Sequence, residues 1–212
     1  MGTIKQGVLG GFSGKVGTVI GSSWKGIQYM RGIAQHVNNP KTPGQLDQRS
    51  KFAITIAFLK PITNFVRTGY KTYGNKQSPF NGAMSYIIQN AILGAYPNYS
   101  LDFSLALVSR GNLKTVEGGG VVAGGGKIAF AWTDNSGNSD AQATDLAMPL
   151  VFNKDKGEAV FNTAAATRDA EMAELNLPAD WIGDKVETYL GFIAADGKNV
   201  ANSVYLGEET VA

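Results

Sequence analysis

Residues 15–33 alternate between apolar and small or polar side chains, which is the pattern of extended strands. Val16 and Ile20 fall on one side of the chain, and a polar stretch at residues 22–26 separates them from a second apolar run. The pattern predicts a β-hairpin of two strands with its connection in that stretch. Nine glycines lie in the first 33 residues. Because glycine offers no side chain for packing, these strands would need a partner surface, in this chain or in another copy.

Apolar positions then change to helical spacing over residues 43–69. Thr42 is placed to cap the start of a helix, and Pro43 suits its first turn. Pro61 should kink or end this helix near Lys60, because proline lacks the N–H that a helix interior needs.

A second helix is predicted over residues 79–93. Ser78 is its expected N-cap, Pro79 its first residue and Gly94 the glycine that ends it. The period then becomes two, which predicts a strand at about residues 99–108.

Short alternating runs separated by turn residues follow to the end of the chain. Ile128, Phe130 and Trp132 are the clearest such run. Regularly spaced short strands indicate a β-sandwich of immunoglobulin size. The predicted fold class is therefore α+β: a glycine-rich hairpin and two helices in a region of residues 1–116, followed by a sandwich domain of residues 117–212.

Charge divides the chain at the same place. The net charge of +2 combines +11 in residues 1–116 with −9 in residues 117–212. Such a division indicates either two domains with complementary faces or head-to-tail association between copies. Both interpretations stay open at this point.

The amino-acid composition excludes several classes of catalytic and metal sites. With no cysteine and one histidine, His36, the chain has no thiol nucleophile, disulfide, cysteine-bound metal or multi-histidine site. Gly14-Lys15 lacks the glycine and the hydroxyl residue of a phosphate-binding loop. The oxygen-rich run from Asp134 to Asp140 does not meet the calcium-loop pattern, so a polar turn is favoured. We expect no cofactor, no catalytic residues and no metal ligands, and hence not an enzyme.

Two resemblances add to this interpretation. The C-terminal half resembles a fibronectin type III-like sandwich through Ile128-x-Phe130-x-Trp132, Leu175-x-Leu177-Pro178 and Tyr189. This resemblance implies a module that binds or spaces other modules.

The whole chain also resembles a family of uncharacterised bacterial proteins. The pattern is GGFSGKVG at residues 10–17, WKG at 24–26 and NP-x-TP-x-Q at 39–45. Its front end is similar to small proteins encoded near phage structural genes, which implies an assembled particle rather than catalysis.

Two groups of residues carry the functional expectation. The expected self-association residues are apolar side chains of the hairpin: Val16, Val19, Ile20, Trp24, Ile27 and Tyr29. The expected basic surface consists of Lys15, Lys25, Arg31, Lys41, Arg49 and Lys51.

The sequence thus predicts a non-enzymatic structural or assembly protein, whose partner is itself or another structural protein. One alternative is a binding module whose sandwich recognises a glycan or protein. A second is nucleic-acid binding by the basic half, which is not favoured because the cations are scattered. No signal peptide or membrane span is visible, so we expect a soluble cytoplasmic protein, or one within an assembled particle.

Overall fold

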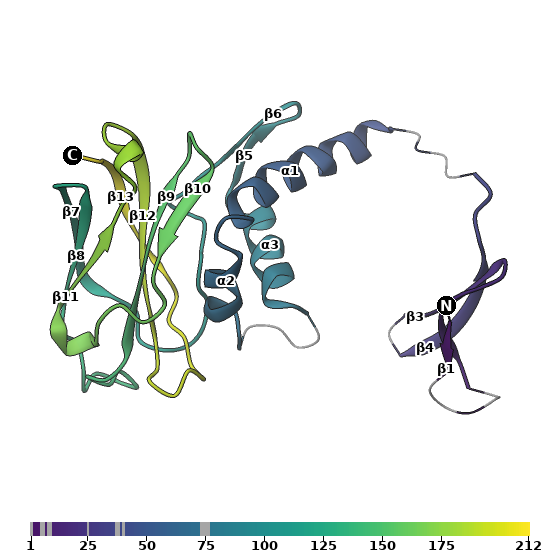
Figure 1. Ribbon diagram of the computed structural model, residues 1–212, viewed down its shortest axis with the longest axis horizontal. Helices are drawn as coiled ribbons and strands as arrows, with labels where there is room; N and C mark the ends of the chain where they lie inside the picture. Colours follow the sequence, from purple (N-terminus) through teal and green to yellow (C-terminus); the bar gives the residue numbers. More distant parts are fainter. Residues whose placement is uncertain are drawn as a thin grey trace. The chain divides into compact units, whose positions relative to one another are not determined.

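A computed structural model of the chain (Figure 1) describes residues 2–4, 7, 10–24, 26–36, 39, 41–72 and 77–212. The chain divides into two compact units, residues 1–42 and residues 43–212. They are called here the N-terminal unit and the C-terminal unit. The predicted boundary at 116/117 therefore falls inside the second unit.

The N-terminal unit is an antiparallel sheet in the order β1-β2-β3-β4. Its strands are Thr3–Ile4, Phe12–Val16, Val19–Trp24 and Ile27–Gly32. The region predicted as one hairpin differs in detail, because Gly17 and Thr18 form a turn inside its first expected strand. Val16 pairs with Val19 across that turn, and Gly17 has a φ of +59°, which glycine adopts without strain.

Three helices begin the C-terminal unit: α1 (Pro43–Leu59), α2 (Thr63–Gly69) and α3 (Pro79–Asn90). The break between α1 and α2 lies at Pro61, as predicted from the missing N–H of proline. At the start of α3 the Ser78 hydroxyl accepts a hydrogen bond of 3.2 Å from the Asn81 N–H, which confirms the predicted cap.

The predictions for residues 79–93 and 99–108 need correction. The helix ends at Asn90, and β5 (Ile92–Ala95) pairs with β6 (Asn98–Leu101) in a small hairpin. Gly94 lies in β5 with a φ of +92°, where a Cβ would collide with the backbone carbonyl of Asn98. Its glycine therefore serves a close strand contact instead of a helix end.

Two antiparallel sheets form the rest of the C-terminal unit. One has the order β10-β9-β12-β13 and the other β11-β8-β7. The strands are β7 (Glu117–Gly124), β8 (Lys127–Thr133), β9 (Leu146–Asn153), β10 (Glu158–Phe161), β11 (Met172–Asn176), β12 (Lys185–Ile193) and β13 (Val204–Thr210). Buried side chains of both sheets meet in one core, where the Trp132 and Phe192 rings are 5.6 Å apart. A two-sheet sandwich was therefore correctly predicted for this region.

The helices cover the other face of the four-stranded sheet (Figure 1). Phe58 of α1 packs edge-on against Phe152 of β9, with ring centroids 5.0 Å apart, and also contacts the Tyr189 ring. A second core therefore joins residues before and after position 116. This shared core is the reason why the helices and the sandwich form one unit and not two domains.

Candidate functional site

The strands of the N-terminal unit sort the predicted association residues onto two faces. Successive side chains of a strand point to opposite faces, and paired residues share a face. The register pairs Trp24 with Ile27 and Ser22 with Tyr29, so Trp24, Ile27, Tyr29 and Ile20 lie together. We call this the aromatic face.

Val16 and Val19 pair with each other on the opposite face. The six predicted residues therefore do not form one patch. Met30 also lies on that opposite face, where it is 71% exposed. The sequence prediction missed Met30, although alternation along the second predicted strand places its side chain on the other face from that of Tyr29.

Large apolar side chains on this sheet are open to solvent. Trp24 is 63% exposed and Ile27 is 67% exposed. Among the described residues of the N-terminal unit, Gly21 alone is buried. The described sheet thus has exposed apolar surface on both faces and no buried side chain.

A glycine contact holds β2 against β3 in place of a core. A Cβ added to Gly21 would overlap the backbone oxygen and the ring of Phe12. By contrast, a Cβ added to Gly32, in β4, would meet nothing within 4 Å. A side chain at position 21 would therefore disrupt the contact between β2 and β3, whereas a side chain at position 32 would fit without a clash.

Three of the six predicted basic residues belong to the N-terminal unit as described. Lys15 of β2 and Arg31 of β4 are both register partners of Ile20 in β3, so they lie on the aromatic face. Lys41 follows the sheet and is exposed. Lys25 lies outside the described residues.

Arg49 and Lys51 lie instead on α1 of the C-terminal unit. The Lys51 ammonium is 3.1 Å from the Asp47 carboxylate and 4.9 Å from the centre of the Tyr99 ring. Hydrogen bonds from the Tyr99 hydroxyl and then from Lys51 lower the pKa of Asp47. Lys51 therefore already has an anionic partner within the unit, which weakens its case as a surface for nucleic acid.

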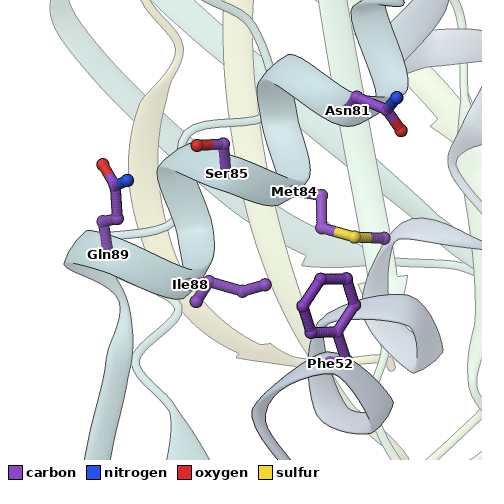
Figure 2. A pocket seen from close by; sticks show the side chains of 6 residues that line it. All are labelled: Phe52, Asn81, Met84, Ser85, Ile88 and Gln89. Carbon is purple, nitrogen blue, oxygen red and sulfur yellow. The ribbon is translucent and has the colours of Figure 1, made fainter. Parts of the chain in front are cut away.

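An apolar groove of about 440 Å³ lies between α1 and α3 (Figure 2). Phe52, Met84 and Ile88 form its floor and point toward one another. The remaining lining residues are Asn81, Ser85 and Gln89. The lining contains no titratable side chain, so the groove can accept an apolar group but offers no acid or base.

A buried polar cluster surrounds Arg168, which was not among the candidate residues of the sequence. Its guanidinium lies 3.1 Å from the Asp145 carboxylate, donates to the Asn135 side chain, and stacks 3.8 Å from the Phe192 ring centre. The Arg168 side chain is fully buried. Its partners lie in the loop that follows β8 and in the loop that precedes β9, so the cluster fastens these loops to each other.

The remaining candidates of the sequence are loop features in the structure. Asp134 accepts hydrogen bonds from the backbone and hydroxyl of Ser136, as in a polar turn. His36 is exposed. Within the described ranges, no group of three or more His, Cys, Asp or Glu residues is arranged to hold a metal ion. None of the described helices has the length and apolar character needed to cross a membrane.

Comparisons with known proteins give a family and a distant structural neighbour. The sequence model of a family described as "Family of unknown function (DUF6266)" matches residues 11–207. No curated protein matches the chain. The fibronectin type III domain of human collagen alpha-1(XX) chain is similar to part of it, with a TM-score of 0.35 and 12% identity, over 49% of this chain and 91% of that one.

Proposed function

The chain belongs to this family of unknown function, DUF6266, and we propose that the protein is a non-enzymatic structural component that assembles with copies of itself through its N-terminal sheet. The observation that carries the proposal is the exposure of large apolar side chains on that sheet, whereas Val19 and Ile20 are half-buried. The exposed ones include Val16, Trp24, Ile27, Tyr29 and Met30. Small sheets need a covered hydrophobic face to be stable, and units near 40 residues rarely supply one alone. A partner surface would provide it.

Charge supports a second copy as the partner. Residues 1–42 contain five Lys or Arg and no Asp or Glu, whereas residues 117–212 have a net charge of −9. Opposite charges on different parts of one chain favour contacts between unlike surfaces of neighbouring copies. Contacts of that kind build rings or filaments, as expected of a component of a particle.

A pair of glycine substitutions in the full-length chain tests the proposal. Gly21→Ala should disrupt the contact of β2 with β3, because the new Cβ would overlap the Phe12 backbone. Gly32→Ala is the matched control, since open space surrounds that position. Multi-angle light scattering at low salt measures the mass of each.

We expect multimers for the natural chain and for Gly32→Ala, and monomers for Gly21→Ala. Added salt should shift the multimers toward monomers, because the attraction between opposite charges is screened. A natural chain that stays monomeric at low salt and high concentration would contradict the proposal. Assembly of Gly21→Ala equal to that of Gly32→Ala would contradict the role of the sheet.

A further inference from the structure

Among the strands that the structure describes, β4 stands at one end of the N-terminal sheet and β11 at one end of the three-stranded sheet, and the charges around these two strands are opposite. We propose that β4 of one copy adds to the β11 edge of another copy. This inference rests on the proposed function and names the surface that receives the N-terminal sheet. Exposed edges carry unpaired N–H and C=O groups that pair readily with a strand from another chain.

The hydrogen bonds of β4 show which of its backbone groups are free. Just beyond β4, Ile33 N–H donates to the Thr18 carbonyl at 2.9 Å. In an antiparallel pair the bonded residues alternate, so Arg31, Tyr29 and Ile27 point their backbone groups toward β3. The groups of the intervening residues, with Met30 at the centre, face outward.

The same argument applies to β11. Trp132 N–H donates to the Glu171 carbonyl at 3.0 Å, and the register continues from there along β8. Alternation then turns the backbone groups of Met172, Glu174 and Asn176 away from β8. Each strand therefore presents a row of outward-facing donors and acceptors of similar length.

Charge selects β11 as the acceptor for the cationic sheet. Residues 169–184, which include β11, contain five Asp or Glu and no Lys or Arg. Three of these acids, Glu174, Asp180 and Asp184, pair with Lys127 or Lys156 elsewhere in the unit. Asp169 and Glu171 in this segment form no salt bridge with any cation that the structure describes. The β10 edge, by comparison, follows directly after Lys154 and Lys156.

Antiparallel addition would also bring exposed apolar side chains onto one face. The outward backbone groups belong to Met30 on one strand and to Met172 on the other, so their side chains would share a face of the extended sheet. Met172 is 57% exposed. Every copy has one β4 edge and one β11 edge, so the contact is head-to-tail and can continue from copy to copy.

Proline substitutions separate the two edges in the full-length chain. Proline at an outward position removes a free N–H and leaves the existing ladder in place, which is why edge strands tolerate it. Met30→Pro should block the adding edge, and Glu174→Pro should block the receiving edge, because Ala173 before it has the extended backbone that a residue preceding proline needs. Circular dichroism and thermal unfolding check that each variant stays folded.

We expect each variant alone to be monomeric and an equimolar mixture to form complexes of two chains, because one intact edge of each kind remains. A mixture that stays monomeric would overturn the inference. If Glu174→Pro assembles like the natural chain while Gly21→Ala does not, β11 is excluded as the acceptor although the proposed function stands. If the natural chain itself does not assemble, the proposed function is contradicted.

Cysteine cross-linking provides a second readout, which does not depend on the proline variants. The chain contains no cysteine, so a Met30→Cys copy mixed with a Met172→Cys copy carries one thiol on each chain. Under oxidation we expect disulfide-linked pairs of one copy of each. Val122→Cys is the control partner, because Val122 is exposed on β7, two strands or about 10 Å from β11. Equal cross-linking to both positions would contradict addition at β11.

Discussion

Two four-stranded antiparallel sheets in this molecule differ in what covers them. The sheet β10-β9-β12-β13 has α1–α3 packed on one face and the three-stranded sheet on the other, so every residue of β12 after Lys185 is buried. The N-terminal sheet has the same number of strands, yet every described residue of β4 is exposed. Hydrogen bonding is similar in the two sheets, and side-chain burial is not.

The difference shows that strand pairing alone does not provide a stable sheet. Burial of apolar surface is the main favourable contribution to folding. The sheet β10-β9-β12-β13, called here the covered sheet, obtains this burial from layers within its own chain. The N-terminal sheet has apolar side chains, but the described residues of its own unit provide no layer over them. Four predictions, from the largest effect to the smallest, examine this difference.

Replacing Arg168 should destabilise the covered sheet most. Arg168→Met leaves the Asp145 carboxylate buried without its cation and removes the stacking on Phe192 of β12. Leaving one partner of a buried ion pair uncompensated costs about 5 kcal/mol at the upper end of the known range. Urea unfolding measures the loss of unfolding free energy.

Lys127→Met is the control for Arg168→Met, because its pair with Glu174 is solvent-exposed. Such pairs contribute about 0–1 kcal/mol. Equal losses for the two variants would show that the Arg168 cluster does not fasten the loops to the sheet.

Removing the aromatic contact of α1 should uncover one face of the same sheet. Phe58→Ala deletes a buried ring that packs against Phe152, with an expected loss of about 4 kcal/mol in unfolding free energy. Phe52→Ala on the same helix is the control, because Phe52 is 44% exposed. Chemical denaturation of both variants is the measurement, and a loss no larger for Phe58 than for Phe52 would contradict the role of the helical layer.

Acid should weaken the covered sheet by protonating its carboxylates, whereas the N-terminal sheet has no carboxylate side chain to protonate. Hydrogen bonds from Lys154 and Lys185 lower the pKa of Glu208, on β13, to about 2 from an ordinary 4.5. A lowered folded-state pKa stabilises the protein above the unfolded pKa, and this contribution is lost as the pH falls from 4.5 toward 2. Residues 1–42 contain no carboxylate side chain.

Unfolding free energies measured between pH 5 and pH 2 check this dependence. Glu208→Gln should reduce the decline, since the neutral amide does not titrate. A decline as steep in the variant as in the natural chain would assign the acid sensitivity to other carboxylates, such as Asp184, whose pKa is lowered by Asn153 and Lys156.

Deleting residues 1–42 should have the smallest effect on the covered sheet. The C-terminal unit contains both hydrophobic cores of the described structure. We expect its unfolding free energy to change by less than about 0.5 kcal/mol, as for changes away from a core. The measurement uses protein dilute enough to exclude association, and a loss of several times that size would mean that the N-terminal sheet stabilises the C-terminal unit.

Local signals in the sequence were reliable where the chemistry is local. Ser78 caps α3 and Pro61 separates α1 from α2, because a cap and a missing N–H act within a few residues. Gly94 was misassigned, because its neighbour across the β5–β6 hairpin decides its conformation and no helix signal is involved.

The candidate site was predictable as a set of residues but not as a surface. Alternation marks the exposed apolar residues of the N-terminal strands, although the sequence cannot say which strand pairs with which register. Register places Ile20 and Trp24 on one face and Val16 on the other. The free edges of β4 and β11 also depend on strand order, which no local pattern contains.

The sequence by itself determined the starts of α1 and α3, the alternating run of β8, the glycine-rich N-terminal strands and the opposite charges of the two halves, since each follows from residue type and spacing. The strand β11 was not predicted. The tertiary structure alone decided that the helices share a core with the four-stranded sheet, that Arg168 is buried, and that the described part of the N-terminal unit leaves its sheet uncovered. The physical reason is that burial depends on contacts between residues far apart in the chain. Phe58 and Phe152 meet at 5.0 Å across 94 positions of sequence.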